Sequence, residues 1–159
     1  MELKNILSER NYKALAINTR GELLGTTTKE NEVQVWNVTK NQMVTRFSHR
    51  DYVYATAFSP SGSVLATASD DGTAGLWDPR TGQSLAILRH GDKVFELVFS
   101  SDGSRLATGT DGEMAYVWRV HTQDLADQAC QIAGRNLTSE EWAQYLGGQP
   151  YRKTCPQWS

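Results

Sequence analysis

Three tryptophans, Trp36, Trp77 and Trp118, lie 41 residues apart, and the sequence before each of them repeats in the same register. The three stretches read AINTRGELLGTTTKENEVQVW, AFSPSGSVLATASDDGTAGLW and VFSSDGSRLATGTDGEMAYVW, and they align without a gap. A fixed period of about 40–45 residues is typical of folds in which each repeat forms one small antiparallel sheet. The repeat therefore constrains the chain to build the same sheet several times.

The middle repeat shows what one unit contains. Its β-branched, aromatic and turn-forming residues predict strands at 52–58, 64–69, 73–77 and 84–88, with turns at 59–62, 70–72 and 78–82. In the first of these strands Val53, Ala55 and Ala57 share one parity and are expected on one face. Four short antiparallel strands per unit predict an all-β fold, with each unit serving as one blade of a β-propeller.

The third predicted strand of the middle repeat ends at Trp77, and Asp78 follows it; with this Trp-Asp dipeptide the chain resembles the WD-repeat family. The resemblance implies a structural tetrad of buried, hydrogen-bonded side chains: His49, Thr67, Asp71 and Trp77. Buried indole, hydroxyl and imidazole groups each need a hydrogen-bond partner, and a network among these side chains would supply one to each of them. His49 and Asp71 alone would also suit a catalytic acid–base pair, but the repeat register favours the structural role.

The other two repeats depart from this pattern. The third offers a partial tetrad of His90, Thr108, Asp111 and Trp118, in which Asp111 stands one residue early and Gly112 occupies the expected position. The first offers Ser8, Thr26, Glu30 and Trp36, without the histidine. These two blades are therefore expected to be less rigid than the middle one.

Residues 1–120 are expected to form three blades, and residues 121–159 a helical tail packed on them. The stretch Glu2–Ile6 aligns with the fourth strand of the other units, which would offset the closure of the ring. Three blades would leave an incomplete ring, since propellers have about four to eight. A second copy in a homo-dimer, a different chain in a hetero-complex, or further blades of a longer protein would complete it.

The tail carries two predicted helices, the second opening at the capping box Thr138-Ser139-Glu140-Glu141. Its text, ACQIAGRNLTSEEWAQYLGGQPYRKTCP, is similar to the C-terminal ends of bacterial, cyanobacterial-type, multidomain WD-repeat signalling and defence proteins. The cytoplasm is the expected location, since the first residues lack the apolar core of a signal peptide. In that compartment Cys130 and Cys155 are expected as reduced thiols, and a disulfide between them is disfavoured.

Composition and motifs argue against several functions. The formal net charge is −2 and no basic stripe is present, which disfavours nucleic acid as a partner. No apolar run is long enough to span a membrane. Two cysteines and three scattered histidines do not form a zinc motif, and no catalytic or cofactor-binding motif stands out. We therefore expect no enzyme, no catalytic residue, no metal and no cofactor.

The resemblance implies a scaffold or sensor module that binds a protein partner. Candidate partner-binding residues follow the two repeat histidines, at the expected open face of the ring: Arg50, Tyr52, Tyr54, Lys93 and Phe95. Aromatic and arginine side chains commonly anchor interfaces, although they also serve as ordinary loop residues. Two alternatives stay open: a structural unit that self-associates into a closed six-bladed ring, and an accessory subunit of an enzyme.

Overall fold

The structure is a computed structural model, and it describes residues 14–120. The chain divides into two compact units, Met1–Trp118 and Arg119–Ser159. The predicted strand Glu2–Ile6, Ser8, the helical tail and both cysteines lie outside the described residues. Residues 14–120 contain strands and turns and no helix, which confirms the all-β prediction for this part of the chain.

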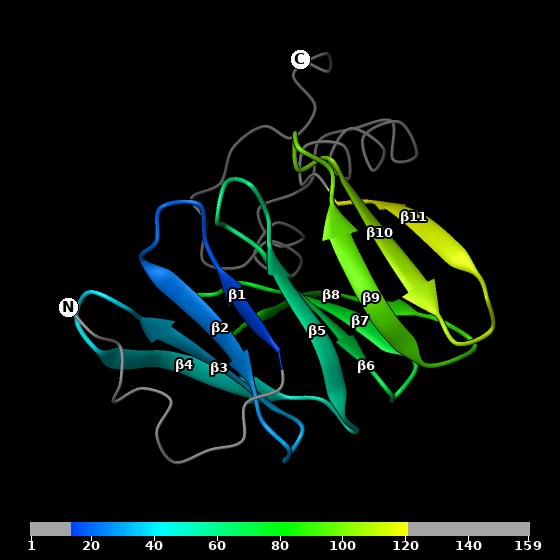
Figure 1. Cartoon of the computed structure of the whole chain (residues 1–159), viewed down its shortest axis with the longest axis horizontal. Helices are drawn as coiled ribbons and strands as arrows, with labels where there is room; N and C mark the ends of the chain where they lie inside the picture. The colour runs from blue at the N-terminus through cyan, green and yellow to red at the C-terminus, as the bar shows by residue number, and fades with distance from the viewer. Residues whose placement is uncertain (1–13, 121–159) are drawn as a thin grey trace, which may run out of the picture. The chain divides into compact units, whose positions relative to one another are not determined.

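The described strands form three separate antiparallel sheets (Figure 1). Within residues 14–120 there are eleven strands: β1 (Leu15–Ile17), β2 (Leu23–Thr27), β3 (Glu32–Asn37), β4 (Gln42–Ser48), β5 (Val53–Phe58), β6 (Leu65–Ser69), β7 (Thr73–Trp77), β8 (Ser84–Arg89), β9 (Val94–Phe99), β10 (Arg105–Thr110) and β11 (Ala115–Arg119). The first sheet has the order β1-β2-β3-β4 and the second β5-β6-β7-β8. The third contains β9, β10 and β11 among the described residues. In each sheet, neighbours in the chain are neighbours in space.

Turn chemistry explains the hairpins. Gly62, Gly72 and Gly103 have positive φ angles of 72°, 78° and 73°, a backbone region that glycine adopts without steric cost. Between β9 and β10, the Asp102 carboxylate accepts hydrogen bonds from the Ser100 hydroxyl and the Ser104 amide. These bonds, with the Ser100 hydroxyl first, lower the pKa of Asp102 to about 2. The turns are therefore fixed locally, as the sequence predicts.

One detail of the predicted strand 52–58 is wrong. The register between β5 and β6 shifts between Val53 and Ala55, which leaves Tyr54 as an extra residue in a β-bulge. Val53 packs in the cluster shared with the first sheet, whereas Ala55 packs in the cluster shared with the third. Val53 and Ala55 therefore lie on opposite faces, because the bulge reverses the alternation at this point.

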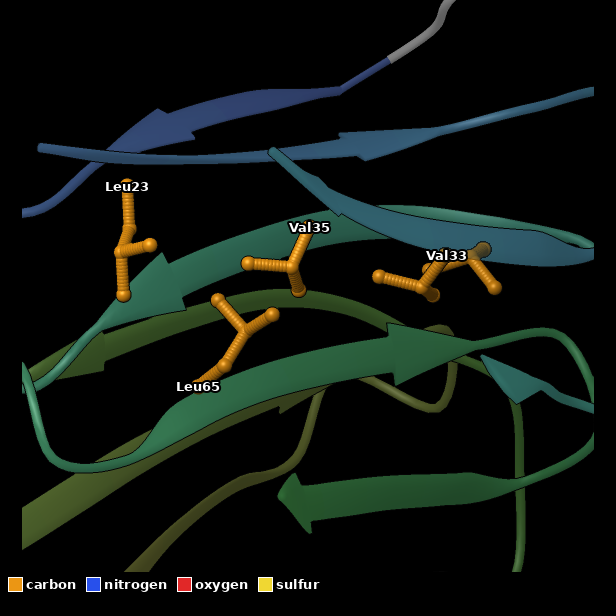
Figure 2. Close-up of a cluster of buried hydrophobic side chains, with 5 residues drawn as sticks. Leu23, Val33, Val35 and Leu65 are labelled. Carbon is orange, nitrogen blue, oxygen red and sulfur yellow. The ribbon is translucent and has the colours of Figure 1, made fainter. Parts of the chain in front are cut away.

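The core consists of two layers between the three sheets. Between the first and second sheets, five fully or nearly fully buried side chains interlock: Leu23, Val33, Val35, Val53 and Leu65 (Figure 2). Between the second and third sheets the layer contains Ala68, Ala74 and Val94, with Leu97 packed against it. Each sheet thus contributes one face to each neighbour, and the middle sheet is covered on both faces.

Candidate functional site

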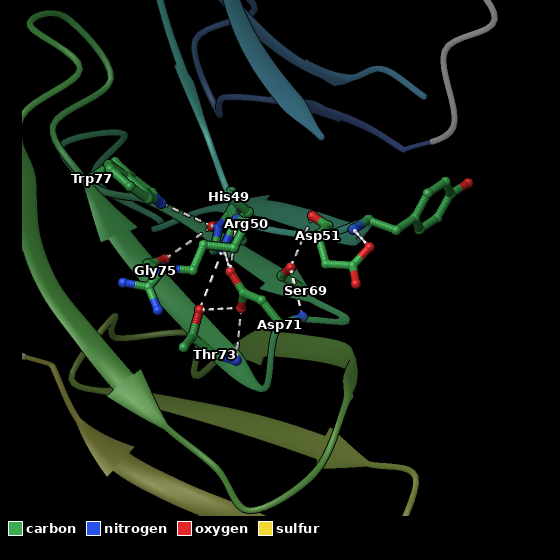
Figure 3. Close-up of polar contacts among 10 residues, drawn as sticks. His49, Arg50, Asp51, Ser69, Asp71, Thr73, Gly75 and Trp77 are labelled. Atoms are coloured by element: carbon green, nitrogen blue, oxygen red, sulfur yellow. Dashed lines mark hydrogen bonds and ion pairs between the residues drawn. The ribbon is translucent and has the colours of Figure 1, made fainter. Parts of the chain in front are cut away.

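A chain of hydrogen bonds runs through the second sheet from a carboxylate to an indole. His49 Nδ1 lies 3.1 Å from Asp71 Oδ2, and His49 Nε2 lies 2.7 Å from Thr67 Oγ1. Trp77 Nε1 donates to the same Thr67 oxygen at 2.8 Å. The carboxylate accepts from Nδ1–H, so that in the neutral imidazole Nε2 accepts the threonine hydroxyl proton. Each polar group of this network therefore has at least one hydrogen-bond partner, and the dashed lines in Figure 3 mark these bonds.

At the other end of this network, the Asp71 carboxylate accepts hydrogen bonds from two further residues. Its Oδ2 accepts the Arg50 amide at 3.0 Å, and its Oδ1 accepts the Thr73 amide at 3.0 Å and the Thr73 hydroxyl at 2.6 Å. Burial alone would raise the pKa of Asp71, but the bonds from Thr73, Arg50 and His49 together lower it below its usual value. The carboxylate therefore stays ionised and ties the connection before β5 to the turn before β7.

The indole at the far end is packed between sheets. Trp77 is buried and stacks on Phe47 of β4, with ring centroids 4.1 Å apart. A Cβ atom at Gly75 would collide with the indole, so a residue without a side chain is needed beneath it. Thr73 and Gly75 were missed in the sequence, although the spacing of alternate residues along β7 places both on the face of Trp77.

The third sheet has a shorter version of the network. His90 Nε2 lies 2.8 Å from Thr108 Oγ1, and Trp118 Nε1 donates to that oxygen at 3.0 Å. Among the described residues, no hydrogen bond joins Asp111 to His90, and His90 Nδ1 is buried without a partner. Burial lowers the pKa of His90, and the nearby Leu88 backbone carbonyl offsets only part of this lowering. Three of the four predicted residues are brought together, and Asp111 is not.

The first sheet brings none of its predicted residues into such a network. The Thr26 hydroxyl donates to the Gln34 carbonyl at 3.4 Å, and within residues 14–120 Trp36 Nε1 has no hydrogen-bond partner. The Glu30 amide donates to Thr28 Oγ1 at 3.3 Å, in the turn between β2 and β3. Ser8 lies outside the described residues.

Four of the predicted partner-binding residues meet at one edge of the second and third sheets. Tyr54 packs against Tyr52, with centroids 4.9 Å apart, and against Phe95, at 4.5 Å. The Tyr54 hydroxyl donates to Asp70 Oδ2 at 3.3 Å, and Lys93 Nζ lies 2.7 Å from Asp70 Oδ1. We call Tyr52, Tyr54, Asp70, Lys93 and Phe95 the edge cluster.

The edge cluster joins two sheets and keeps exposed surface. Its three aromatic rings are half-buried and the Lys93 side chain is exposed. The hydrogen bond and attraction from Asp70 raise the pKa of Lys93, while desolvation and then repulsion by Asp70 raise the pKa of Tyr54. Asp70 was missed in the sequence, where it reads as an ordinary turn residue. Arg50 stands apart: it joins the polar network through its backbone amide.

Metal-binding clusters and membrane-spanning helices are both absent from the described residues. No group of three or more His, Cys, Asp or Glu side chains among residues 14–120 is placed to hold a metal ion. The described residues also include no helix with the length and apolar character needed to cross a membrane.

Comparison with known proteins agrees with the repeated architecture. Residues 41–78 and 82–119 match the family described as "WD domain, G-beta repeat". The first matched segment takes β4 from one sheet and β5–β7 from the next, and the second takes β8 and β9–β11 in the same way. Comparison with curated proteins gives no match. The chain thus contains two WD40 repeats, each running from the last strand of one sheet through three strands of the following sheet.

Proposed function

We propose that this chain is a non-catalytic protein-interaction module in which the edge cluster binds a protein partner. WD40 repeats generally mediate protein–protein interaction. The single observation that carries the proposal is the edge cluster itself, in which three aromatic rings and a lysine from two repeats converge on partly exposed surface. Buried aromatic anchors beside a polar rim are the usual makeup of the energetic centre of an interface.

The neighbouring polar network supports this role. His49 and Asp71 are almost completely buried, with side-chain exposures of 2% and 9%. The bonds of Asp71 to Arg50 and Thr73 fix the chain segments on either side of the edge cluster. A surface held in one conformation loses less conformational entropy when a partner binds. The network would therefore prepare the edge cluster for binding without contacting the partner.

The wider setting is also part of the proposal. The similarity of the C-terminal stretch to bacterial multidomain WD-repeat proteins favours a cytoplasmic signalling or defence role, with this module as the sensor. In such a setting the partner, or another domain, would supply any catalysis.

Site-specific photo-crosslinking tests the binding surface. A photo-reactive phenylalanine analogue replaces Phe95 in the full chain expressed in its host cell, and cross-linked proteins are identified by mass spectrometry. The matched control places the same analogue at Arg80, an exposed residue in the turn at the opposite edge of the second sheet. We expect a defined product at position 95 that is absent at position 80.

A second variant confirms that the contact is specific. Tyr54→Ala should reduce capture of the identified partner by about 10-fold or more, because a central aromatic anchor contributes about 2 kcal/mol. Equal cross-linking at positions 80 and 95, or capture unaffected by Tyr54→Ala, would overturn the proposal.

A further inference from the structure

The three sheets repeat one interface, and this repetition identifies two further surfaces. In the first interface the face of the first sheet bearing Val33 and Val35 meets the face of the second sheet bearing Val53 and Leu65. In the second interface Ala68 and Ala74 of the second sheet meet Val94 and Leu97 of the third. In each interface, we call the contacting face of the earlier sheet its forward face and the contacting face of the later sheet its rear face. Within residues 14–120, the rear face of the first sheet and the forward face of the third sheet take part in neither interface.

The rear face of the first sheet exposes large apolar side chains. The register pairs Ile17 with Leu24 and Leu24 with Trp36, which places these three on one face. Val35 packs toward the second sheet, so this face is directed away from it. Leu15 and Ile17 are 55% and 56% exposed.

The aligned residues of the other sheets are packed. Ile17 aligns with Phe58, which packs against the first sheet, and Leu15 aligns with Leu97, which packs against the second. Leu15 and Ile17 therefore occupy positions that elsewhere in the same chain make contact with a preceding sheet.

The forward face of the third sheet is apolar in the same way. Trp118 bonds Thr108, and Thr108 pairs with Leu97, so all three lie on the rear face. Val98 follows Leu97 and Val117 precedes Trp118. Because successive side chains of a strand point to opposite faces, both valines lie on the forward face. They are 62% and 65% exposed.

The exposure of Val117 contrasts with its counterparts. Val35, at the same position in the first sheet, packs against the second sheet and is 0% exposed. Leu76, at the same position in the second sheet, is 6% exposed and lies on the face of Ala74, which packs against the third sheet. An exposed apolar patch made of positions that are otherwise interface positions marks an association surface.

We propose that the forward face of the third sheet packs on the rear face of the first sheet of a second copy, and that two copies close a six-sheet ring. The described part of each copy offers one face of each kind, so two identical interfaces form about a two-fold axis. Two copies are the arrangement that gives a sheet number within the roughly four to eight found in rings of this type. This proposal does not depend on the edge cluster or on the partner proposed above.

Solution mass and its response to two point substitutions test the ring. Light scattering on a sizing column should give twice the 17.7 kDa chain mass for the unaltered full chain. Ile17→Asp and Val117→Asp should each raise the dimer dissociation constant by roughly 100-fold or more, since each buries an unpaired carboxylate in an apolar contact. Leu85→Asp is the control, because Leu85 is 49% exposed but belongs to the middle sheet. Circular dichroism melting checks that all three variants fold.

Mixing the two end variants tests which faces meet. In a mixed pair, one interface carries both substitutions and the other carries neither, so an equimolar mixture should recover dimer that neither variant forms alone. A monomeric unaltered chain, dissociation by only one of the two substitutions, or no recovery on mixing would each overturn the proposal. Dissociation by Leu85→Asp would do so as well.

Discussion

The second and third sheets are built on aligned sequences, yet the polar network reaches a carboxylate in one and stops at an imidazole in the other. The difference comes from one position, where the second sheet has Asp71 and the third has Gly112. With Asp71, both nitrogens of His49 are bonded; with Gly112, His90 Nδ1 is buried without a partner among the described residues. One carboxylate thus decides whether the network also fixes the surrounding loops.

The two indoles differ as well. Trp77 is buried over Gly75 and stacks on Phe47 of the preceding sheet at 4.1 Å. Trp118 is half-buried and stacks on Tyr116 of its own strand at 6.0 Å. The second sheet therefore couples its network to a neighbour, whereas the third keeps its ring contacts local. The same repeat positions therefore form a four-residue hydrogen-bond network in the second sheet and a three-residue network in the third.

Removing the indoles should give the largest contrast. Trp77→Ala should lower the free energy of unfolding by about 3–5 kcal/mol, and Trp118→Ala by roughly half of that, because less of its ring is buried. Urea unfolding followed by far-ultraviolet circular dichroism measures both without relying on tryptophan fluorescence. A melting temperature of Trp77→Ala close to that of the unaltered chain would show that Trp77 is not part of a buried network.

Removing the histidines isolates the carboxylate. His49→Ala leaves the Thr67 hydroxyl and the Asp71 carboxylate without their ring partners and should lower the free energy of unfolding by about 2–3 kcal/mol. His90→Ala should cost about 1 kcal/mol, since it breaks a network that already has an unpaired nitrogen. The same urea assay compares them. Equal losses would mean that Asp71 adds nothing to the second sheet.

Adding a single methyl group tests the packing beneath Trp77. Gly75→Ala should lower the free energy of unfolding by about 1–3 kcal/mol, because its Cβ would displace the indole. Gly109→Ala is the control in the third sheet: the nearest atom to its Cβ would be Glu96 Cβ at 3.8 Å, an ordinary contact. It should change stability by less than about 0.5 kcal/mol. A neutral Gly75→Ala would show that the indole has room to move.

The smallest expected effect is a pH dependence that belongs to the third sheet. The pKa of His90 is lowered from its ordinary 6.5, so below pH 6.5 the unfolded chain binds a proton that the folded chain resists. Stability should therefore fall as the pH drops below 6.5, and the fall should level off once the pH passes the folded pKa. Melting temperatures between pH 7 and 5 for the unaltered chain and for His90→Gln measure this.

The two networks separate by pH. Because the pKa of Asp71 is lowered from its ordinary value of 3.8, its carboxylate contributes stability that is present above pH 3.8 and is lost as the pH falls through the folded pKa. This loss lies below the range from pH 7 to 5 used for His90. If His90→Gln keeps the slope between pH 7 and 5, another group is responsible for it.

Much of the fold follows from local sequence signals. The 41-residue period and the turn glycines predict three similar antiparallel sheets, and the predicted strand 73–77 agrees with β7. The residues His49, Thr67, Asp71 and Trp77 are also found together at the repeat positions from which they were predicted. These features depend on residues near one another along the chain or on a motif repeated in register.

The tertiary structure decided which residues face and contact one another across neighbouring sheets. The bulge at Tyr54 sets which face Val53 occupies, and the edge cluster forms because Lys93 of one repeat reaches Asp70 of the previous one. Asp111 lies one residue from the required position and stays outside the network of His90. Sequence alone determined which strands and hydrogen-bonding groups exist, because these are local properties. Which groups meet across two sheets depends on packing, and a shift of one residue there exchanges one face of a strand for the other.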